Sequence, residues 1–77
     1  MYVILGREEL IDEEDIIGVF DLDNASWSYL TREYLARAEK AGRVKNLSDG
    51  LPRSLIVTAD RDYLSQLTPQ RIAARRL

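Results

Sequence analysis

The first third of the chain alternates short apolar runs with polar breaks, a pattern typical of β-strands. The run "YVIL" at residues 2–5 is closed by Gly6 and predicts a buried strand. Residues 7–11, "REELI", either pair with this strand or form a connecting strand. After a polar break at residues 12–15, the run "IIGVFDL" predicts another strand over residues 16–22.

This third run has apolar side chains on both faces, which favours a central strand. Strict alternation places Ile16 and Phe20 on one face, and Ile17 and Val19 on the other. Gly18, in the middle of the run, indicates a bulge or a close backbone contact.

The segment "SWSYLTREYLARAEKAG" at residues 26–42 has helical periodicity and gives the strongest signal in the chain. Asn24 is the predicted N-cap, and Gly42 is the predicted C-terminal stop. Glu33 and Arg37 form a favourable i,i+4 pair. One face of the helix collects the apolar positions Leu30, Tyr34, Ala38 and Ala41, with Trp27 above them.

Turn-forming residues make "RVKNLSDGLPR" at residues 43–53 a predicted loop. The β-branched run "SLIVTA" at residues 54–59 and the run "YLSQL" at 63–67 predict a hairpin. Thr68 then caps a last helix, with Pro69 at its first position. The predicted order is ββ(β)αββα, an α+β fold with a small antiparallel sheet and two helices in a single domain over residues 1–77.

Composition narrows the sources of stability for so small a chain. At 77 residues the hydrophobic core is marginal, and such domains usually rely on disulfides, a metal or oligomerisation. The chain has no cysteine and no histidine, so disulfides and thiolate or imidazole metal sites are excluded. Self-association is therefore the expected extra source of stability.

No run approaches the roughly 20 apolar residues that span a bilayer, so no membrane partner is expected. The N-terminal residues also lack the basic region and the long apolar stretch of a signal peptide. The expected location is the cytoplasm.

Charge is divided unevenly along the chain. Residues 1–30 hold one basic and eight acidic side chains, whereas residues 31–77 hold ten basic and five acidic ones. Such asymmetry indicates a nucleic-acid surface or a pair of complementary faces. It is equally compatible with two halves that neutralise each other within one fold.

The sequence offers no pattern typical of a catalytic, metal or cofactor site. The acidic run from Asp12 to Asp15 lacks the alternate spacing and the glycine turn of a calcium loop, so a solvated turn is expected. No nucleophile has a histidine or cysteine available beside it, and the glycines form no phosphate loop. We therefore expect no enzyme activity, no cofactor and no small-molecule substrate.

The basic residues of the second half are the candidates for a nucleic-acid site. Arg71, Arg75 and Arg76 share one side of the last helix. Basic groups in a last helical turn also favour the helix dipole, by about 0.3–1 kcal/mol each, so a local explanation needs no partner. A wider basic surface is possible if the fold brings these together with the other candidates Arg53, Arg43 and Lys45. Alternatively, the arginines are scattered, or paired with Glu39, Asp60 and Asp62.

Two stretches occur in order along the chain, "DIIGVFD" at residues 15–21 and "PRSLIVT" at residues 52–58. Together with the start "MYVILG" and the basic ending, they resemble the RemA/RemB family of bacterial extracellular-matrix regulators. The resemblance covers nearly the whole chain and is closer to RemB. It implies a cytoplasmic activator of biofilm-matrix genes that assembles as a closed ring and binds double-stranded DNA on a basic face. A ring needs a contact between two different patches, which an acidic first half and a basic second half could supply.

The chain departs from the RemA pattern at two places. The resemblance implies an arginine just before residue 16, where this chain has acidic residues, and an arginine pair before residue 54, where only Arg53 is basic. Fewer phosphate contacts weaken DNA binding. Two hypotheses follow: a RemB-like regulator that binds DNA through Arg53 and the closing arginines, or a ring-forming scaffold that acts through protein contacts.

Overall fold

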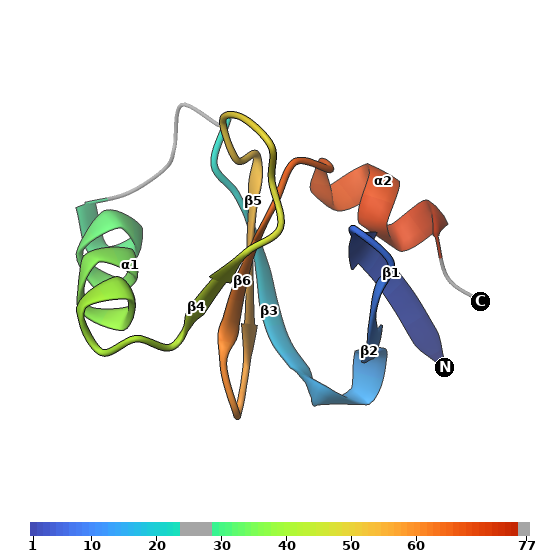
Figure 1. Cartoon of the computed structure of the whole chain (residues 1–77), viewed down its shortest axis with the longest axis horizontal. Coiled ribbons are helices and arrows are strands. Elements are labelled where there is room, and N and C mark those ends of the chain that lie inside the picture. Colours follow the sequence, from blue (N-terminus) through green and yellow to red (C-terminus); the bar gives the residue numbers. More distant parts are fainter. Residues whose placement is uncertain (24–28, 76–77) are drawn as a thin grey trace.

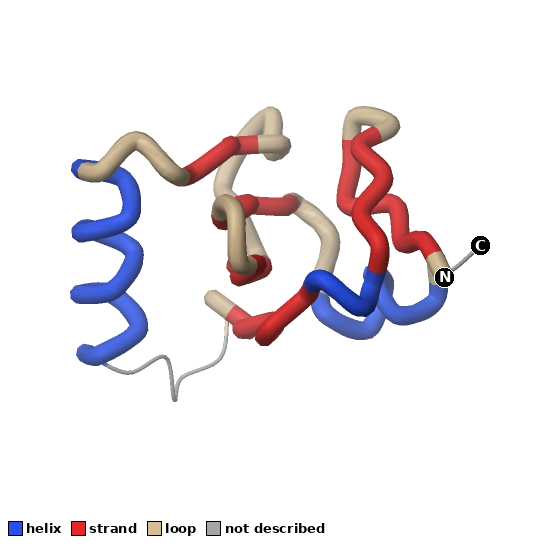
Figure 2. Tube along the Cα trace, turned by 90° about the horizontal axis from the view of Figure 1, so that it is seen from below, coloured by secondary structure: helices blue, strands red, loops and turns tan. Residues whose placement is uncertain are grey.

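A computed structural model describes residues 1–23 and 29–75 and arranges them in three layers (Figure 1). Helix α1 forms one outer layer, a four-stranded sheet lies in the middle, and a two-stranded hairpin with helix α2 forms the other outer layer. Figure 2 shows the same order in a perpendicular view. The elements, in chain order, are β1 (Tyr2–Gly6), β2 (Glu9–Asp12), the short 3-10 helix η1 (Glu13–Asp15), β3 (Ile16–Asp21), α1 (Tyr29–Lys40), β4 (Val44–Asn46), β5 (Ser54–Thr58), β6 (Asp62–Ser65) and α2 (Pro69–Ala74).

Strands β1 and β2 pair antiparallel as a hairpin, which confirms the pairing alternative for residues 7–11. The turn between them is made by Arg7 and Glu8, both with positive φ angles of 49° and 63°. Two positive φ angles in a two-residue connection match the twist of the flanking strands. Val3 and Leu5 point into the core, whereas Tyr2 and Leu10 are exposed on the outer face.

The middle sheet has the strand order β3-β5-β6-β4, and it is mixed rather than purely antiparallel. The predicted hairpin is confirmed, because β5 pairs antiparallel with β6. The predicted central position of residues 16–22 is wrong, because β3 is an edge strand. Its two apolar faces point toward the layers on both sides of the sheet, although Ile17, Val19 and Phe20 remain exposed.

The bulge predicted at Gly18 is confirmed by a register shift in the pairing of β3 with β5, between Ile16 and Gly18. The extra residue reverses the expected alternation, so the predicted distribution of side chains between the two faces is wrong. Ile17 and Phe20 line a hollow beside α1, whereas Ile16 and Val19 line another beside α2.

The predicted loop at residues 43–53 contains a strand that the pattern did not reveal. Strand β4 pairs in parallel with β6, with Val44 opposite Asp62 and Asn46 opposite Leu64. A three-residue strand carries too little periodicity to be recognised, and each of its residues pairs with one that lies 18 positions further along the chain.

Helix α1 ends as predicted at Gly42, whose φ is +74°. The amide of Gly42 donates to the carbonyl of Glu39 at 3.0 Å, and the amide of Arg43 donates to the carbonyl of Ala38 at 3.0 Å. These two bonds form a Schellman motif that satisfies the last carbonyls of the helix. The ion pair of Arg37 with Glu33 is also present, at 2.7 Å. The predicted cap Asn24, together with Trp27, lies outside the described residues.

Helix α2 begins as predicted, with Thr68 accepting a hydrogen bond from the amide of Arg71 and Pro69 in the first turn. Its buried residue, Ile72, joins the main core cluster between the sheet and the hairpin layer: Val3, Leu5, Leu47, Ile56, Tyr63 and Ile72. Two buried serines tie this layer together. The hydroxyl of Ser65 donates to the carbonyl of Leu5, and that of Ser54 to the carbonyl of Leu67, both at 2.6 Å.

None of the helices that the structure describes is long and apolar enough to cross a membrane.

Candidate interaction surfaces

Arg43 lies at the junction of α1 and β4, where it is engaged with a buried carboxylate. Its Nε donates to Oδ2 of Asp62 at 3.2 Å, and its NH2 group donates to the carbonyl of Thr58 at 3.0 Å. The hydroxyl of Tyr34 donates to the same Asp62 oxygen at 2.8 Å. Asp62 is fully buried, so this triad neutralises a charge that would otherwise be costly inside the protein.

The triad also sets the protonation of its members. Burial, and then the hydrogen bond to Asp62, raise the pKa of Tyr34 above its ordinary value of 10.0, so the phenol stays neutral. The hydrogen bond to Asp62 raises the pKa of Arg43. The triad therefore ties the end of α1 to the sheet and engages the Nε and Nη2 groups of the Arg43 side chain.

Lys45 and Arg53 are also engaged with acidic partners. Lys45 Nζ lies 2.9 Å from Oε1 of Glu9, and Arg53 Nε lies 2.6 Å from Oδ2 of Asp23. Arg53 and Arg43 stand at opposite ends of strand β6, since the Arg53 amide bonds Ser65 while the Asp62 amide bonds the carbonyl of Arg43. The fold therefore does not gather these three candidates into one basic patch.

Arg71 and Arg75 remain exposed on α2 and its C-terminal cap. Within residues 1–23 and 29–75 neither side chain makes an ion pair, in contrast to Arg43, Lys45 and Arg53. Arg76 lies outside the described residues. Of the six candidates, the two on α2 are the ones whose guanidinium groups the described structure leaves available.

The acidic run ahead of β3 forms η1, and Asp12 caps it by accepting a hydrogen bond from the amide of Glu14 at 3.1 Å. Glu14 and Asp15 are exposed. In the described part of the chain, no three acidic side chains are grouped in a way that could hold a metal ion.

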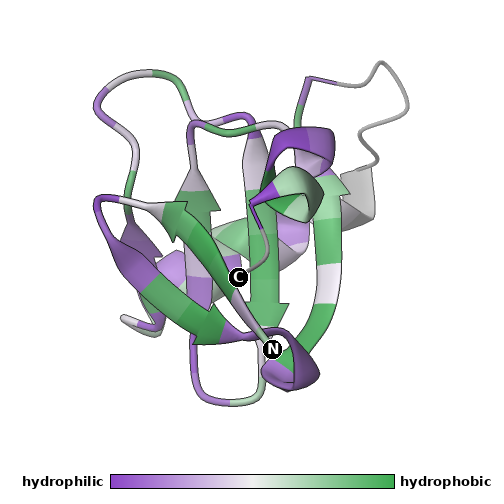
Figure 3. Cartoon of the chain, turned by 90° about the vertical axis from the view of Figure 1, so that its right-hand side faces the viewer, coloured by the Kyte–Doolittle hydropathy of each residue, from purple (hydrophilic) through white to green (hydrophobic). Residues whose placement is uncertain are grey.

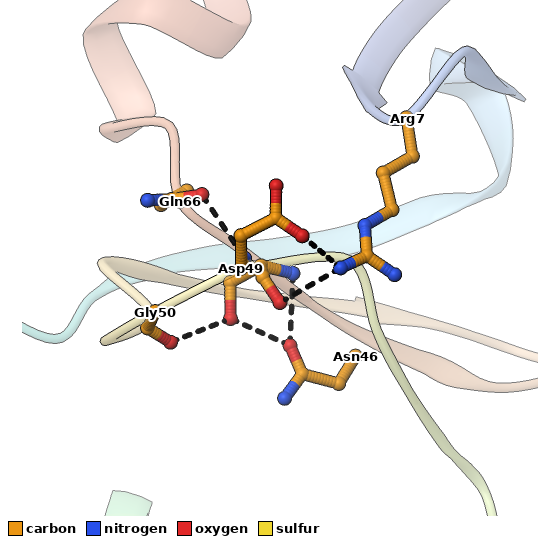
Figure 4. A network of polar contacts seen from close by, with 6 residues as sticks. Arg7, Asn46, Asp49, Gly50 and Gln66 are labelled. Carbon is orange, nitrogen blue, oxygen red and sulfur yellow. Dashed lines mark hydrogen bonds and ion pairs between the residues drawn. The ribbon is translucent and has the colours of Figure 1, made fainter.

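The loop from β4 to β5 is held by a polar network, shown in Figure 4. Ser48 donates from its hydroxyl and its amide to the side chain of Asn46, at 2.6 and 2.9 Å. Asp49 forms an ion pair with Arg7 of the hairpin turn, and its amide donates to Gln66 at 3.1 Å. Leu51, at the tip of this loop, is 82% exposed.

A hollow of about 270 Å³ opens between α1 and β3 and was not found by sequence reasoning. Its lining includes Ile17, Phe20 and Tyr34, which are 71%, 44% and 39% exposed. The bulge at Gly18 creates this surface by turning Ile17 and Phe20 to the same side. The sequence feature that could have revealed this hollow is the presence of apolar residues on both faces of residues 16–22, which we interpreted as a central strand.

A second exposed apolar surface lies at the opposite end of the molecule, on the outer face of the β1–β2 hairpin. Figure 3 looks at this end and shows the hydrophobic stretches of the two strands. Tyr2 and Leu10 are 53% and 49% exposed, and Ile4 lies opposite Leu10 in the strand register.

The chain matches no family model. It is 31% identical, over 75 residues, to extracellular matrix regulatory protein B of Bacillus subtilis (strain 168), an alignment that covers 97% of this chain and 89% of that protein. The chain belongs to the RemB family. The resemblance stated from the sequence motifs is thus confirmed.

Within this RemB-family chain, the two departures from the RemA pattern lie far apart. Residues 13–15 precede β3 and Arg53 precedes β5, and the two strands pair antiparallel with Ile16 opposite Thr58 and Asp21 opposite Ser54. The departures therefore stand at opposite ends of the ladder, about 17 Å apart at the usual rise per residue. A charge at one of these positions has little effect on the electrostatics at the other, because this distance exceeds the roughly 8 Å screening length at physiological salt.

Proposed function

We propose that this protein is a regulator of extracellular-matrix genes that works as a ring of identical subunits and binds DNA. The observation that carries the proposal is the match to extracellular matrix regulatory protein B over 97% of the chain. The proposal places the protein in the cytoplasm, with DNA and further copies of itself as partners, and without catalysis or a cofactor.

The exposure of Arg71 and Arg75 supports α2 as the element that contacts DNA. Arg71 and Arg75 are exposed, and they have no ion-pair partner among the described residues, so their guanidinium groups are free to meet phosphates. Phosphate contacts supply most non-specific DNA affinity, and a ring repeats each contact once per subunit. Arg76 would extend the same basic end of the chain.

Electrophoretic retardation of duplex DNA at 50 and 200 mM salt tests this proposal. We expect binding that weakens steeply with salt, and a double variant Arg71→Ala/Arg75→Ala that binds more weakly. Its salt slope should fall by about 0.9 for each phosphate that the variant no longer neutralises. The matched control, Arg37→Ala/Arg61→Ala, removes the same charge from other surfaces and should bind like the wild type. Equally weakened binding by both variants would contradict a role for α2.

A scaffold with little DNA affinity is the second candidate, and the engaged state of Arg43, Lys45 and Arg53 favours it. The acidic residues of η1 ahead of β3 also repel phosphate. An assembled wild-type protein that retards no DNA at micromolar concentration and low salt would support this candidate and exclude direct DNA binding.

A further inference from the structure

A small hollow with a basic wall lies where the turn after α1 meets the turn between β5 and β6. Figure 1 shows both turns on the lower side of the view. The hollow has a volume of about 210 Å³, and its lining residues are Gly42, Arg43, Val44, Lys45, Asp60 and Arg61. Three of these residues carry a positive charge and one carries a negative charge, so the wall has a net charge of +2.

Arg61 is the cation of this wall that has no acidic partner in the described part of the chain. The other two cations, Arg43 and Lys45, form ion pairs with carboxylates that lie outside the wall. The backbone of Arg61 is nevertheless fixed, because its amide donates to the hydroxyl of Thr58 at 3.2 Å and its carbonyl accepts from the amide of Thr58 at 3.1 Å. An exposed guanidinium group therefore lines the hollow from a fixed position in the chain.

Arg43 adds a second guanidinium group, which is already ordered. Its Nε donates to Asp62 at 3.2 Å, and its Nη2 donates to the carbonyl of Thr58 at 3.0 Å. Neither bond uses the Nη1 group, which carries two further N–H donors. Because the side chain is already held, a ligand that binds to Nη1 costs little additional side-chain entropy.

The open edge of β4 adds a backbone donor to the wall. Strand β4 lies at the edge of its sheet, next to β6. The carbonyl of Arg43 accepts from the amide of Asp62, and the amide of Leu47 donates to the carbonyl of Leu64, both at 2.8 Å. Successive residues of a strand direct their backbone groups to opposite edges, so the amide of Val44 is directed away from β6, to the open edge.

These donors favour a phosphate group as the ligand. Guanidinium groups bind phosphate through paired, charge-assisted hydrogen bonds. A phosphate group has three strong acceptor oxygens and can engage two guanidinium groups and an amide together, whereas a carboxylate has two oxygens. The hollow is smaller than the roughly 300–1,000 Å³ of sites for drug-sized ligands, so it suits one small charged group.

The hollow is separate from the arginines of α2. Figure 1 shows α1 and α2 on opposite sides of the four-stranded sheet, and the hollow adjoins the C-terminal turn of α1. A phosphate bound in it is therefore not one of the DNA phosphates that α2 is proposed to contact. The position and the size of the hollow favour a small phosphate-bearing molecule over the backbone of a duplex.

We propose that this hollow binds a small phosphate-bearing anion, which is held by the guanidinium groups of Arg61 and Arg43 and by the amide of Val44. Lys45 adds positive charge to the wall. The bound phosphate connects the turn after α1 with the β5–β6 turn and stabilises the folded chain by mass action. The site is independent of the proposed DNA-binding role, which rests on α2.

Titration of ¹⁵N-labelled protein with inorganic phosphate tests the site, with chloride at matched ionic strength as the reference. We expect saturable shifts of the amide signals of Gly42, Val44 and Arg61. A parallel titration with adenosine monophosphate distinguishes the two forms of the ligand. Tighter binding of the nucleotide would support a phosphate ester, and tighter binding of inorganic phosphate would support the free ion.

Two variants of the wall should change the phosphate affinity in opposite directions. Arg61→Ala should weaken binding about tenfold or more, because a charge-assisted interaction is lost. Asp60→Asn should strengthen binding about two- to fivefold, because the negative charge of the wall is removed. Both side chains are exposed, so the fold should survive, as circular dichroism will show. The matched control Arg37→Ala removes an equal charge from an exposed position of α1 outside this wall and should bind phosphate like the wild type.

Three outcomes would overturn the inference. Shifts in phosphate that equal those in chloride at every concentration would show that the wall binds no phosphate. Equal weakening by Arg61→Ala and Arg37→Ala would show general attraction to a basic surface. Shifts of the same amides with duplex DNA, but with neither inorganic phosphate nor the nucleotide, would assign the wall to the DNA-contacting surface. The first two outcomes leave the proposed DNA binding by α2 intact, since the α2 double variant tests it separately.

Discussion

Asp62 is the residue whose environment the fold controls most tightly. Its side chain is fully buried, Oδ2 accepts hydrogen bonds from Tyr34 and Arg43, and Oδ1 has no partner among the described atoms. A buried carboxylate with incomplete hydrogen bonding is stable only while its partners remain in place. Tyr34 and Arg43 belong to α1 and its C-terminal turn, so this single residue ties one outer layer to the sheet.

Tyr34→Phe tests this tie. We expect a loss of about 1 kcal/mol of unfolding free energy at pH 7, because the carboxylate loses one donor. The pKa of Tyr34 is raised in the folded state, so its contribution is fully present below pH 10 and is lost as the pH rises through the folded pKa. Urea unfolding at pH 7 and at more alkaline pH measures both effects. Tyr2→Phe is the control, and an equal loss there would contradict the assignment.

The helix end and the hairpin turn differ in whether a glycine occupies the positions where the backbone has a positive φ angle. Gly42 occupies a left-handed position at the end of α1, and a Cβ there would meet no atom within 4 Å. The hairpin turn uses Arg7 and Glu8 at positive φ, where side-chain residues are strained by about 1–2 kcal/mol each. Arg7 is held there by its ion pair with Asp49, which links the turn to the β4–β5 loop (Figure 4).

Opposite effects are expected from two glycine changes. Glu8→Gly should raise the unfolding free energy by about 0.5–1 kcal/mol, because relief of the positive φ exceeds the added entropy of the unfolded chain. Gly42→Ala should lower it by about 1 kcal/mol through backbone strain alone, since the space around it is open. Thermal unfolding measures both. A destabilised Glu8→Gly protein would show that the Glu8 side chain makes a contact worth more than the strain.

At the scale of the whole molecule, most burial lies on one side of the sheet. The core cluster joins the sheet to the hairpin and α2, whereas Ala38 is the one buried side chain among those described in α1, residues 31–40. A chain of 77 residues in which one interface between layers is well packed is expected to have a small free energy of unfolding. Contacts between copies would then add directly to the stability of the fold.

The midpoint of thermal unfolding should therefore rise with protein concentration, because association stabilises the folded state by mass action. Measurement over a hundredfold range of concentration checks this. A wild-type midpoint that stays constant over the same range would contradict a stabilising role for assembly.

Features that depend on neighbouring residues could be predicted from the sequence alone. The end of α1 at Gly42, the cap of α2 at Thr68, the β5–β6 hairpin and the bulge at Gly18 all follow from backbone preferences within a few residues. The family could likewise be recognised from short motifs, since these motifs follow one another in order over nearly the whole chain.

Tertiary structure decided everything that depends on distant partners. Arg53, Lys45 and Arg43 meet acidic residues 30, 36 and 19 positions away, so their availability to DNA could not be read from charge or spacing. The edge position of β3 and the parallel pairing of β4 depend in the same way on strands far along the chain. A periodic pattern predicts which side of an element is buried, but it does not predict which other elements cover that side. That information comes only from the arrangement of the layers in the folded protein.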